Sequence, residues 1–263
     1  MSARTRILRV VVAYDGAEFA GWQRQAGQRT VQGELEAVVT RIEGAHVSVS
    51  AAGRTDAGVH AAAQVVSFGL TASITPERLV RACNASLPTD VRVLSVEEMP
   101  DRFHARIHAR GKTYRYFVWH APTGAPLLRR TAWHVPQRMS LTALQDAAAL
   151  FVGEHDFSAF QAQGSDVRST VRRVWTSTVE PELALPPWCA AGDERARLLT
   201  FEVSGSGFLR HQVRAMVGTL VLIGKGRLSL ADLRRALDGG SRAAAGPTAP
   251  ACGLHLWKVH YET

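Results

Sequence analysis

Leu8-Arg9-Val10-Val11-Val12-Ala13-Tyr14 is a run rich in β-branched residues, and it predicts a strand from which the rest of the fold can be laid out. A helix is expected next, because apolar residues recur on one helical face after Thr30, a favoured N-cap residue. Residues 64–68 and 91–96 predict further strands. Between them, Thr75-Pro76 is a helix-start signal. The first half of the chain therefore alternates strands with helices.

The second half repeats this alternation. Strands are expected at residues 113–119, 171–179 and 198–203, and a helical apolar stripe is expected at residues 141–151. Two later helices are predicted, one with an apolar stripe over residues 213–221 and one that begins after Ser229 with a capping box at Asp232. Residues 181–196 and 241–250 resemble loops. With a seam near residues 105–111, we expect mixed α and β structure in two halves, residues 1–108 and 109–263.

The composition indicates a globular protein with a polyanionic partner. The chain has 263 residues, of which 46% are hydrophobic, enough to bury one large core or two smaller ones. Lys and Arg total 31 against 23 Asp and Glu, a formal net charge of +8. Such a charge favours either a nucleic acid or an anionic membrane surface. Charge alone does not choose between the two.

Several other functional classes are disfavoured. The longest apolar run, residues 216–223, is too short to span a membrane, and we find no export signal at the N-terminus. Cys83, Cys189 and Cys252 are far apart and odd in number, so the sequence supports neither a disulfide framework nor a zinc cluster. We therefore expect the protein in a reducing cytoplasm. Because HExxH, GxSxG and phosphate-loop motifs are missing from the sequence, we expect no metal centre, no serine hydrolase site and no nucleotide cofactor.

The chemistry is expected in residues 51–62, a Gly- and Ala-rich stretch that brings Arg54, Asp56 and His60 close together. Taken alone, Asp-Ala-Gly is common in turns, so Asp56 also has a purely structural interpretation. The longer string Gly53-Arg54-Thr55-Asp56-Ala57-Gly58-Val59-His60-Ala61 favours a loop whose small residues let a ligand approach closely. We therefore take Asp56 as the candidate catalytic carboxylate.

A second cluster interleaves basic side chains with aromatic rings over residues 103–116. Strand alternation would place Tyr114 and Tyr116 on one face and Arg115 on the other. This pattern suits RNA, because cations hold phosphates while rings stack on unpaired bases. The alternative is a solvated edge strand with two tyrosines in the core.

A third cluster, residues 204–214, joins a glycine-loosened strand end to the basic first turns of a helix, where Arg210 and Arg214 are one turn apart. It fails as a dinucleotide-binding fingerprint, because Gly205-x-Gly207 is followed by Arg210 where a third glycine is needed. An arginine in this place could instead hold a nearby carboxylate in its ionised form.

Together these clusters resemble the tRNA pseudouridine synthase A family, TruA, in their order and spacing. The likeness runs from about Arg6 to Tyr261 and includes Tyr14-Asp15-Gly16, Gly21-Trp22-Gln23-Arg24-Gln25, Gly53 to His60, Phe103-His104-Ala105-Arg106, Lys112-Thr113-Tyr114-Arg115-Tyr116, His155-Asp156-Phe157, Gly207-Phe208-Leu209 and Thr248-Ala249-Pro250. A colinear set of this kind is far more specific than any single motif.

This resemblance implies an α+β fold of two related halves, each a mostly antiparallel sheet with helices on one face. The sheets would adjoin around a central basic cleft that the second half completes. It also implies a homodimer that holds one tRNA across both subunits. The implied reaction turns uridine into pseudouridine on the 3′ side of the anticodon stem-loop, at tRNA positions 38 to 40, without a cofactor.

The same resemblance implies roles for single residues. Asp56 matches the catalytic aspartate, Tyr114 the active-site tyrosine that stacks on the target base, and Arg214 the basic partner of the aspartate. Arg54 matches a loop arginine that holds the RNA and extrudes the base. Two segments match those that contact tRNA, and their residues are Phe103, His104, Ala105, Arg106, Ile107, Gly164, Ser165, Asp166, Val167 and Arg168. No metal ligand is implied.

The reaction breaks the bond from C1′ to N1 and joins C1′ to C5 of the same base, with no redox change. Ionised Asp56 could attack C1′, stabilise a cationic sugar, or remove a sugar proton to give a glycal-like intermediate, and the sequence leaves these routes open. Three other functions are also open: a non-catalytic RNA-binding protein, a pseudouridine synthase for another RNA, or a hydrolase that cleaves without re-forming the bond. Asp56 together with Arg54 and Arg214 favours catalysis.

Overall fold

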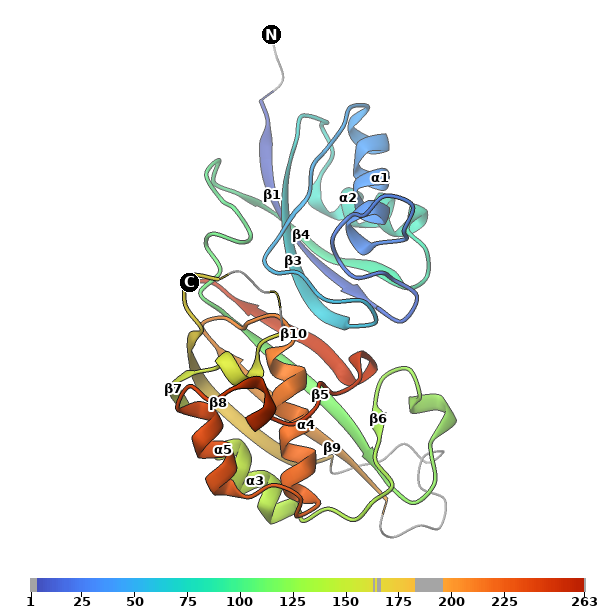
Figure 1. Ribbon diagram of the computed structural model, residues 1–263. Helices are drawn as coiled ribbons and strands as arrows, with labels where there is room; N and C mark the ends of the chain where they lie inside the picture. The colour runs from blue at the N-terminus through green and yellow to red at the C-terminus, as the bar shows by residue number, and fades with distance from the viewer. Residues whose placement is uncertain (1–3, 163, 165–166, 183–195, 263) are drawn as a thin grey trace. The chain divides into compact units, whose positions relative to one another are not determined.

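The computed structural model describes residues 4–162, 164, 167–182 and 196–262, and its elements are drawn in Figure 1. The chain forms two compact units. The first runs from the N-terminus to Arg110 and includes His255–Thr263, and the second runs from Gly111 to Leu254. The last residues of the chain therefore belong to the same unit as its first strand.

The first unit is built on an antiparallel sheet in which β1 (Arg6–Tyr14) lies between β4 (Val91–Met99) and β3 (His60–Leu70). The short strand β2 (Ser50–Ala51) also pairs with β3. The last strand, β10 (Leu254–His260), pairs with β3 in the parallel sense. Because β1 has a neighbour on each side, its whole length is held, including the end that leads into the residues around Gly16.

Two helices accompany this sheet and begin at the capping residues that the sequence predicts. α1 (Val31–Glu43) follows Thr30, whose hydroxyl oxygen accepts a hydrogen bond from the Gly33 amide at 3.3 Å. α2 (Pro76–Ser86) follows Thr75 and has its proline in the first turn. Helix α2 packs against β4 and contacts α1, so the two helices and the sheet enclose one core (Figure 1).

The second unit is built on a sheet of four antiparallel neighbours in the order β5 (Gly111–His120), β9 (Arg197–Gly205), β8 (Val171–Pro181) and β7 (Gly153–Asp156). A two-residue strand, β6 (Trp133–His134), adds to β5 in the parallel sense. Pairing between β5 and β9 is continuous from Lys112 opposite Gly205 to His120 opposite Arg197. Strand β5 is therefore a rigid base for the side chains it carries.

Three helices cover one face of this sheet: α3 (Leu141–Ala149), α4 (Gln212–Gly224) and α5 (Leu230–Leu237) (Figure 1). Helix α5 begins with the predicted capping box between Ser229 and Asp232. Beneath the helices four aromatic rings pack with centroids between 5.6 and 6.5 Å apart, which adds to the stabilisation from area burial. They belong to Phe151, Phe157, Phe160 and Phe201. Single 3₁₀ turns lie at Pro126–Leu128, Ser158–Phe160, Arg242–Ala244 and Ala251–Gly253.

Helix α4 is buried along most of its length, and residues 246–250, which we call the closing segment, pack across it. The contact depends on Gly218, because a Cβ added there would lie 1.7 Å from the Pro247 carbonyl oxygen. Next to it the Gly246 N–H donates a hydrogen bond to the Thr219 hydroxyl at 2.8 Å. A glycine is therefore needed where the two backbones meet.

The α+β class and the mostly antiparallel pairing are confirmed. The observed strands are longer than the apolar runs that predict them, because pairing with a neighbour extends a strand beyond its apolar residues. Strands β7 and β10 and the two-residue strands are not among the predicted elements. Most of the predicted loop at residues 181–196 lies outside the described residues. Among the residues that are described, no helix has the length and apolar character needed to cross a membrane.

We expect Gly218→Ala to destabilise the second unit, because the added methyl group would push the closing segment away from α4. Overpacking of this kind costs about 1–3 kcal/mol, which exceeds the gain of about 1 kcal/mol from alanine in a helix. Urea unfolding followed by circular dichroism should show a lower midpoint. The control is Gly207→Ala, where the added Cβ meets nothing within 4 Å. Equal midpoints for the two variants would contradict this interpretation.

Candidate active site

Asp56 lies in residues 52–59, which connect β2 with β3 in the first unit and which we call the Asp loop. The loop starts where the Ala52 N–H donates to the Val65 carbonyl at 2.8 Å, and it ends at His60, the first residue of β3. The Arg54 side chain is exposed and Asp56 is partly exposed. One short loop thus presents a carboxylate and a guanidinium to the surroundings.

The Asp loop is held by residues 15–22, which follow β1 and which we call the bracing segment. The Trp22 N–H donates to the Thr55 carbonyl at 3.0 Å, and the Gly58 N–H donates to the Phe19 carbonyl at 3.3 Å. Within the loop, the Val59 N–H donates to the Asp56 carbonyl at 3.1 Å. Backbone groups before and after Asp56 therefore have hydrogen-bond partners, which a loop of stable shape requires.

Two glycines let the bracing segment come this close. A Cβ added at Gly16 would lie 2.0 Å from the Val59 carbonyl oxygen, and one added at Gly21 would lie 2.8 Å from the Thr55 carbonyl oxygen. Gly21 also has a φ of +102°, which residues with a side chain rarely adopt. The glycines of the opening motif therefore have a packing role at the Asp loop.

Phe19 in the bracing segment is fixed in turn by Arg29. The guanidinium carbon of Arg29 lies 4.2 Å from the centroid of the Phe19 ring. The same guanidinium makes two hydrogen bonds to the Asp90 carboxylate, at 2.8 and 2.9 Å, and one to Glu34 at 2.8 Å. Its hydrogen bonds to Asp90 raise the pKa of Arg29 further above its ordinary value. An ion-paired cation therefore anchors the segment that braces the loop.

Three buried polar side chains, Tyr14, Thr55 and Gln64, support the Asp loop from within the first unit. The hydroxyl oxygens of Tyr14 and Thr55 are 2.8 Å apart, and the Gln64 amide nitrogen donates to the Gly53 carbonyl at 2.8 Å. Burial raises the pKa of Tyr14 to about 12, and the hydrogen bonds with Thr55 and Gln64 oppose this shift. Tyr14 is therefore a neutral phenol at physiological pH.

His60, which the sequence groups with Arg54 and Asp56, is buried against the bracing segment. Its Nδ1 accepts a hydrogen bond from the Gly16 N–H at 3.1 Å. Its ring stacks on that of His255 in β10, with centroids 4.6 Å apart and planes inclined by 16°. Unlike the exposed Arg54, His60 joins the end of the Asp loop to the rest of the first unit.

The first segment predicted to contact RNA, residues 103–107, forms turns at the surface of the first unit. Ala105 anchors it, because its N–H donates to the Ser67 hydroxyl at 3.0 Å and its carbonyl accepts from the Tyr261 hydroxyl at 2.7 Å. By contrast, Ile107 is 73% exposed. The segment thus combines a fixed centre with a side chain that projects into solvent.

The neighbours of this anchor are ordered by local contacts. The Phe103 ring stacks with that of His108 at a centroid distance of 5.7 Å. The Nδ1 of His104 accepts a hydrogen bond from the Arg106 N–H at 3.2 Å, and the Arg106 side chain is exposed. A cation is therefore presented on a turn of defined shape.

Tyr114 lies on β5 in the second unit, where its ring is buried. The rings of Tyr114 and Phe208 make an edge-to-face contact, with centroids 5.3 Å apart and planes at 88°. Tyr116 is buried as well, while Arg115 pairs with Glu202 at 2.6 Å. The alternation predicted for this strand is therefore confirmed.

Arg214 lies in the first turn of α4 and is oriented by the closing segment. Its Nε donates to the Ala249 carbonyl at 2.7 Å, and its own carbonyl accepts from the Ala249 N–H at 3.1 Å. The Tyr116 hydroxyl donates to the neighbouring Pro250 carbonyl at 2.8 Å, and burial raises the pKa of Tyr116. The side chains of Arg214 and Tyr116 thus both donate hydrogen bonds to backbone carbonyls of the closing segment.

The second segment predicted to contact RNA is described in part. Ser165 and Asp166 lie outside the described residues. Gly164, Val167 and Arg168 are exposed, and Gly164 has a φ of +73°, which glycine adopts without strain.

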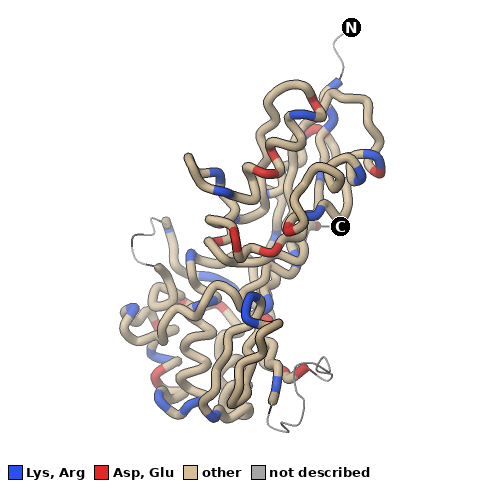
Figure 2. Tube along the Cα trace, turned by 90° about the vertical axis from the view of Figure 1, so that its right-hand side faces the viewer, with Lys and Arg blue, Asp and Glu red and all other residues tan. Residues whose placement is uncertain are grey.

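Basic residues occur in both units, interspersed with acidic ones (Figure 2). Several arginines of the first unit are ion-paired, such as Arg4 with Asp101 at 3.0 Å. Within the described part of the chain, Arg54 and Arg106 are exposed and take part in no ion pair. Their charges are therefore available to a phosphate group.

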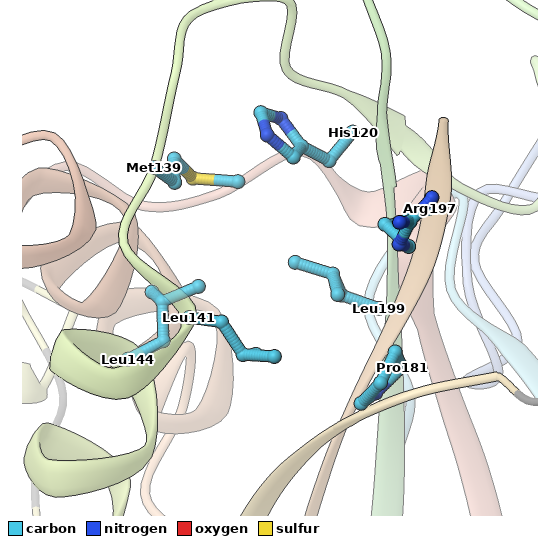
Figure 3. A pocket seen from close by; sticks show the side chains of 7 residues that line it. All are labelled: His120, Met139, Leu141, Leu144, Pro181, Arg197 and Leu199. Atoms are coloured by element: carbon cyan, nitrogen blue, oxygen red, sulfur yellow. The ribbon is translucent and has the colours of Figure 1, made fainter. Parts of the chain in front are cut away.

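A cavity of about 230 Å³ lies elsewhere in the second unit (Figure 3). Its lining combines apolar and basic side chains and consists of His120, Met139, Leu141, Leu144, Pro181, Arg197 and Leu199. His120 and Tyr114 are about 20 Å apart along β5, so the cavity contains none of the predicted site residues. No group of three His, Cys, Asp or Glu suited to a metal ion occurs among the described residues.

The predicted site residues are divided between the units. Arg54, Asp56 and residues 103–107 belong to the first unit, and Tyr114 and Arg214 belong to the second. The residues that support them have no role predicted from the sequence, and they are Tyr14, Thr55, Gln64 and Ala249. Tyr14 and Ala249 lie within two of the motifs that carry the family resemblance, Tyr14-Asp15-Gly16 and Thr248-Ala249-Pro250, and this could have marked them as candidates. No local pattern predicts which residues they contact.

Comparison with known proteins gives a consistent result. A protein family described as tRNA pseudouridine synthase matches residues 10–107 and 147–262, which include the Asp loop and α4. The chain is 42% identical over 260 residues to a tRNA pseudouridine synthase A of Geobacillus kaustophilus, covering 98% of this chain and 95% of the relative. It is 41% identical over 257 residues to one from an Exiguobacterium species, covering 98% of each. The chain belongs to the tRNA pseudouridine synthase family.

Proposed function

We propose that this protein isomerises uridine to pseudouridine on the 3′ side of the anticodon stem-loop of tRNA, with Asp56 as the catalytic carboxylate. The observation that carries this proposal is the Asp loop, a partly exposed carboxylate on a backbone that is held before and after it. Reacting groups lower a barrier most when they are held in the reacting geometry. Family membership supports the type of reaction, and the name of the relatives supports tRNA as the substrate.

The reaction needs a carboxylate and no external electrons. The bond from C1′ to N1 breaks, the bond from C1′ to C5 forms, the hydrogen at C5 leaves as a proton, and N1 gains a proton. An ionised Asp56 serves each of three routes: attack on C1′, stabilisation of a cationic sugar, or removal of a sugar proton. Arg214 is proposed as the cation that keeps Asp56 ionised, and its hydrogen bond to Ala249 supports a fixed guanidinium.

Tyr114 is proposed to stack on the target base. Taking a base out of its stack costs a few kcal/mol, and contact with an aromatic ring offsets part of that cost. The position of Tyr114 on the continuously paired strand β5, with Phe208 against its ring, supports a platform of fixed orientation. Arg54, exposed in the same loop as Asp56, is proposed to hold the RNA as the base is extruded.

The remaining tRNA contacts are proposed for residues 103–107 and 164–168. Exposed Arg106 and Arg168 support contacts with phosphates, and exposed Ile107 supports an apolar contact with a base or ribose. We also propose that the protein works as a homodimer in the cytoplasm. The wide spacing of its cysteines and its formal net charge of +8 are compatible with a reducing compartment and a tRNA partner.

Asp56→Asn is expected to abolish turnover and keep tRNA binding, because asparagine has the shape of aspartate without its negative charge. Turnover is measured as tritium release from tRNA labelled at C5 of uridine, since that hydrogen leaves in the reaction. We expect a rate lower by at least about a thousandfold, with tRNA affinity unchanged.

The matched control for this variant is Asp146→Asn, which makes the same change of charge at an exposed position of α3. It should release tritium at the wild-type rate. Full activity of Asp56→Asn would refute the assignment. Free uracil among the products of the wild-type protein would indicate that the reaction is hydrolysis. Mapping of pseudouridine in the treated tRNA then identifies which positions are modified.

Replacing Tyr114 separates its ring from its hydroxyl. Tyr114→Ala is expected to lose about 1–3 kcal/mol of stacking, equivalent to a roughly 5- to 150-fold weaker apparent affinity for tRNA. Tyr114→Phe keeps the ring and is expected to bind as the wild type does. Filter binding measures the affinities, and tritium release from the phenylalanine variant tests whether the hydroxyl also moves a proton. Equal binding by the alanine variant and the wild type would contradict stacking.

A further inference from the structure

Tyr14 is a buried residue at the end of β1 that the reaction as proposed above does not use. It lies opposite Ala61 of β3 and Val91 of β4, so its backbone is held on both sides. Its ring is 5% exposed and lies 6.2 Å from the Trp22 ring, centroid to centroid. The Tyr14 hydroxyl therefore has a fixed position within the first unit.

This hydroxyl contacts the residue directly before Asp56. The hydroxyl oxygens of Tyr14 and Thr55 are 2.8 Å apart, and Thr55 is 7% exposed. The Thr55 carbonyl accepts from the Trp22 N–H at 3.0 Å. Strand β1 thus holds the side chain of Thr55 while the bracing segment holds its backbone, and one peptide bond links Thr55 to Asp56.

Stability alone does not require two hydroxyl groups at this place. Replacing both partners of a buried hydrogen bond by apolar groups of the same shape is often nearly neutral. What the pair adds is direction, because a hydrogen bond has preferred distances and angles while hydrophobic contact is non-directional. Gln64, which is fully buried and bonded to the Gly53 carbonyl at 2.8 Å, restrains the start of the same loop.

We propose that Tyr14, acting through Thr55, is a positioning residue that sets the orientation of the Asp56 carboxylate for reaction. This inference rests on the proposed function of Asp56. Because Tyr14 is buried, the proposed effect passes through Thr55 and needs no contact between Tyr14 and the substrate. Its effect follows from geometry, since a displacement of about 1 Å at a reacting group can slow a reaction about a hundredfold.

Three single variants test this role. Tyr14→Phe removes one oxygen and keeps the ring, Thr55→Val removes the partner hydroxyl with little change of shape, and Thr55→Ser keeps that hydroxyl. For the first two we expect kcat for tritium release to fall about ten- to a hundredfold, with an unchanged KM for tRNA. Thr55→Ser is expected to remain close to the wild type.

The double variant Tyr14→Phe with Thr55→Val tests whether the two residues act as a unit. Its kcat should be no lower than that of either single variant, because the second change removes a group that has already lost its partner. The matched control is Thr40→Val, which removes the hydroxyl that accepts from the Val47 N–H at 3.1 Å in the same unit. It should lower the unfolding midpoint and leave kcat unchanged.

Asp56→Asn is assayed in parallel, so that the two hypotheses can fail separately. If Asp56→Asn is inactive while Tyr14→Phe keeps the wild-type kcat, only the positioning role is refuted. If Asp56→Asn is fully active, the proposed function fails as well. The positioning role would also be refuted if the decrease in kcat of the double variant equalled the product of the decreases in the two single variants. An equal decrease in kcat for Thr40→Val and Tyr14→Phe would refute it as well.

Discussion

The contact between the bracing segment and the Asp loop is the constraint on which the candidate active site depends. The catalytic role proposed for Asp56 requires a carboxylate that its substrate can reach and a loop that keeps one shape. The protein meets both needs by fixing the backbone at Thr55 and Gly58 and leaving the Asp56 side chain partly exposed. Gly16 and Gly21 make this possible, because a side chain at either position would overlap the carbonyl oxygens of the loop.

In the second unit the closing segment holds Arg214 in a similar way, through the hydrogen bond from Arg214 to the Ala249 carbonyl. In both places the candidate residue lies on one element and is oriented by a segment distant in the sequence, residues 15–22 for the Asp loop and residues 246–250 for α4. In both places a glycine permits backbone approach, and Gly218 is the one that meets Pro247. In both places hydrogen bonds to backbone carbonyls contribute to this orientation.

Much of the local structure could be predicted from residues near one another in the chain. Thr30, Thr75 and Ser229 predict where α1, α2 and α5 begin, because capping is an interaction across three residues. Alternation along β5 predicts which face carries the tyrosines, because successive strand residues point to opposite sides. The string around Asp56 and the colinear motifs predicted the family, and the comparisons confirmed it. The roles of the individual site residues stay predictions.

By itself, then, the sequence determined the α+β class, the starts of α1, α2 and α5 and the family, and with the family the type of reaction. Only the tertiary structure decided that β10 returns to pair with β3, that Tyr14 bonds to Thr55, and that Ala249 receives the guanidinium of Arg214. Caps and periodic patterns arise from interactions within a few residues, and so they leave a local signal. A strand pairing or a buried hydrogen bond joins residues far apart, and the packing of the whole unit selects the partner.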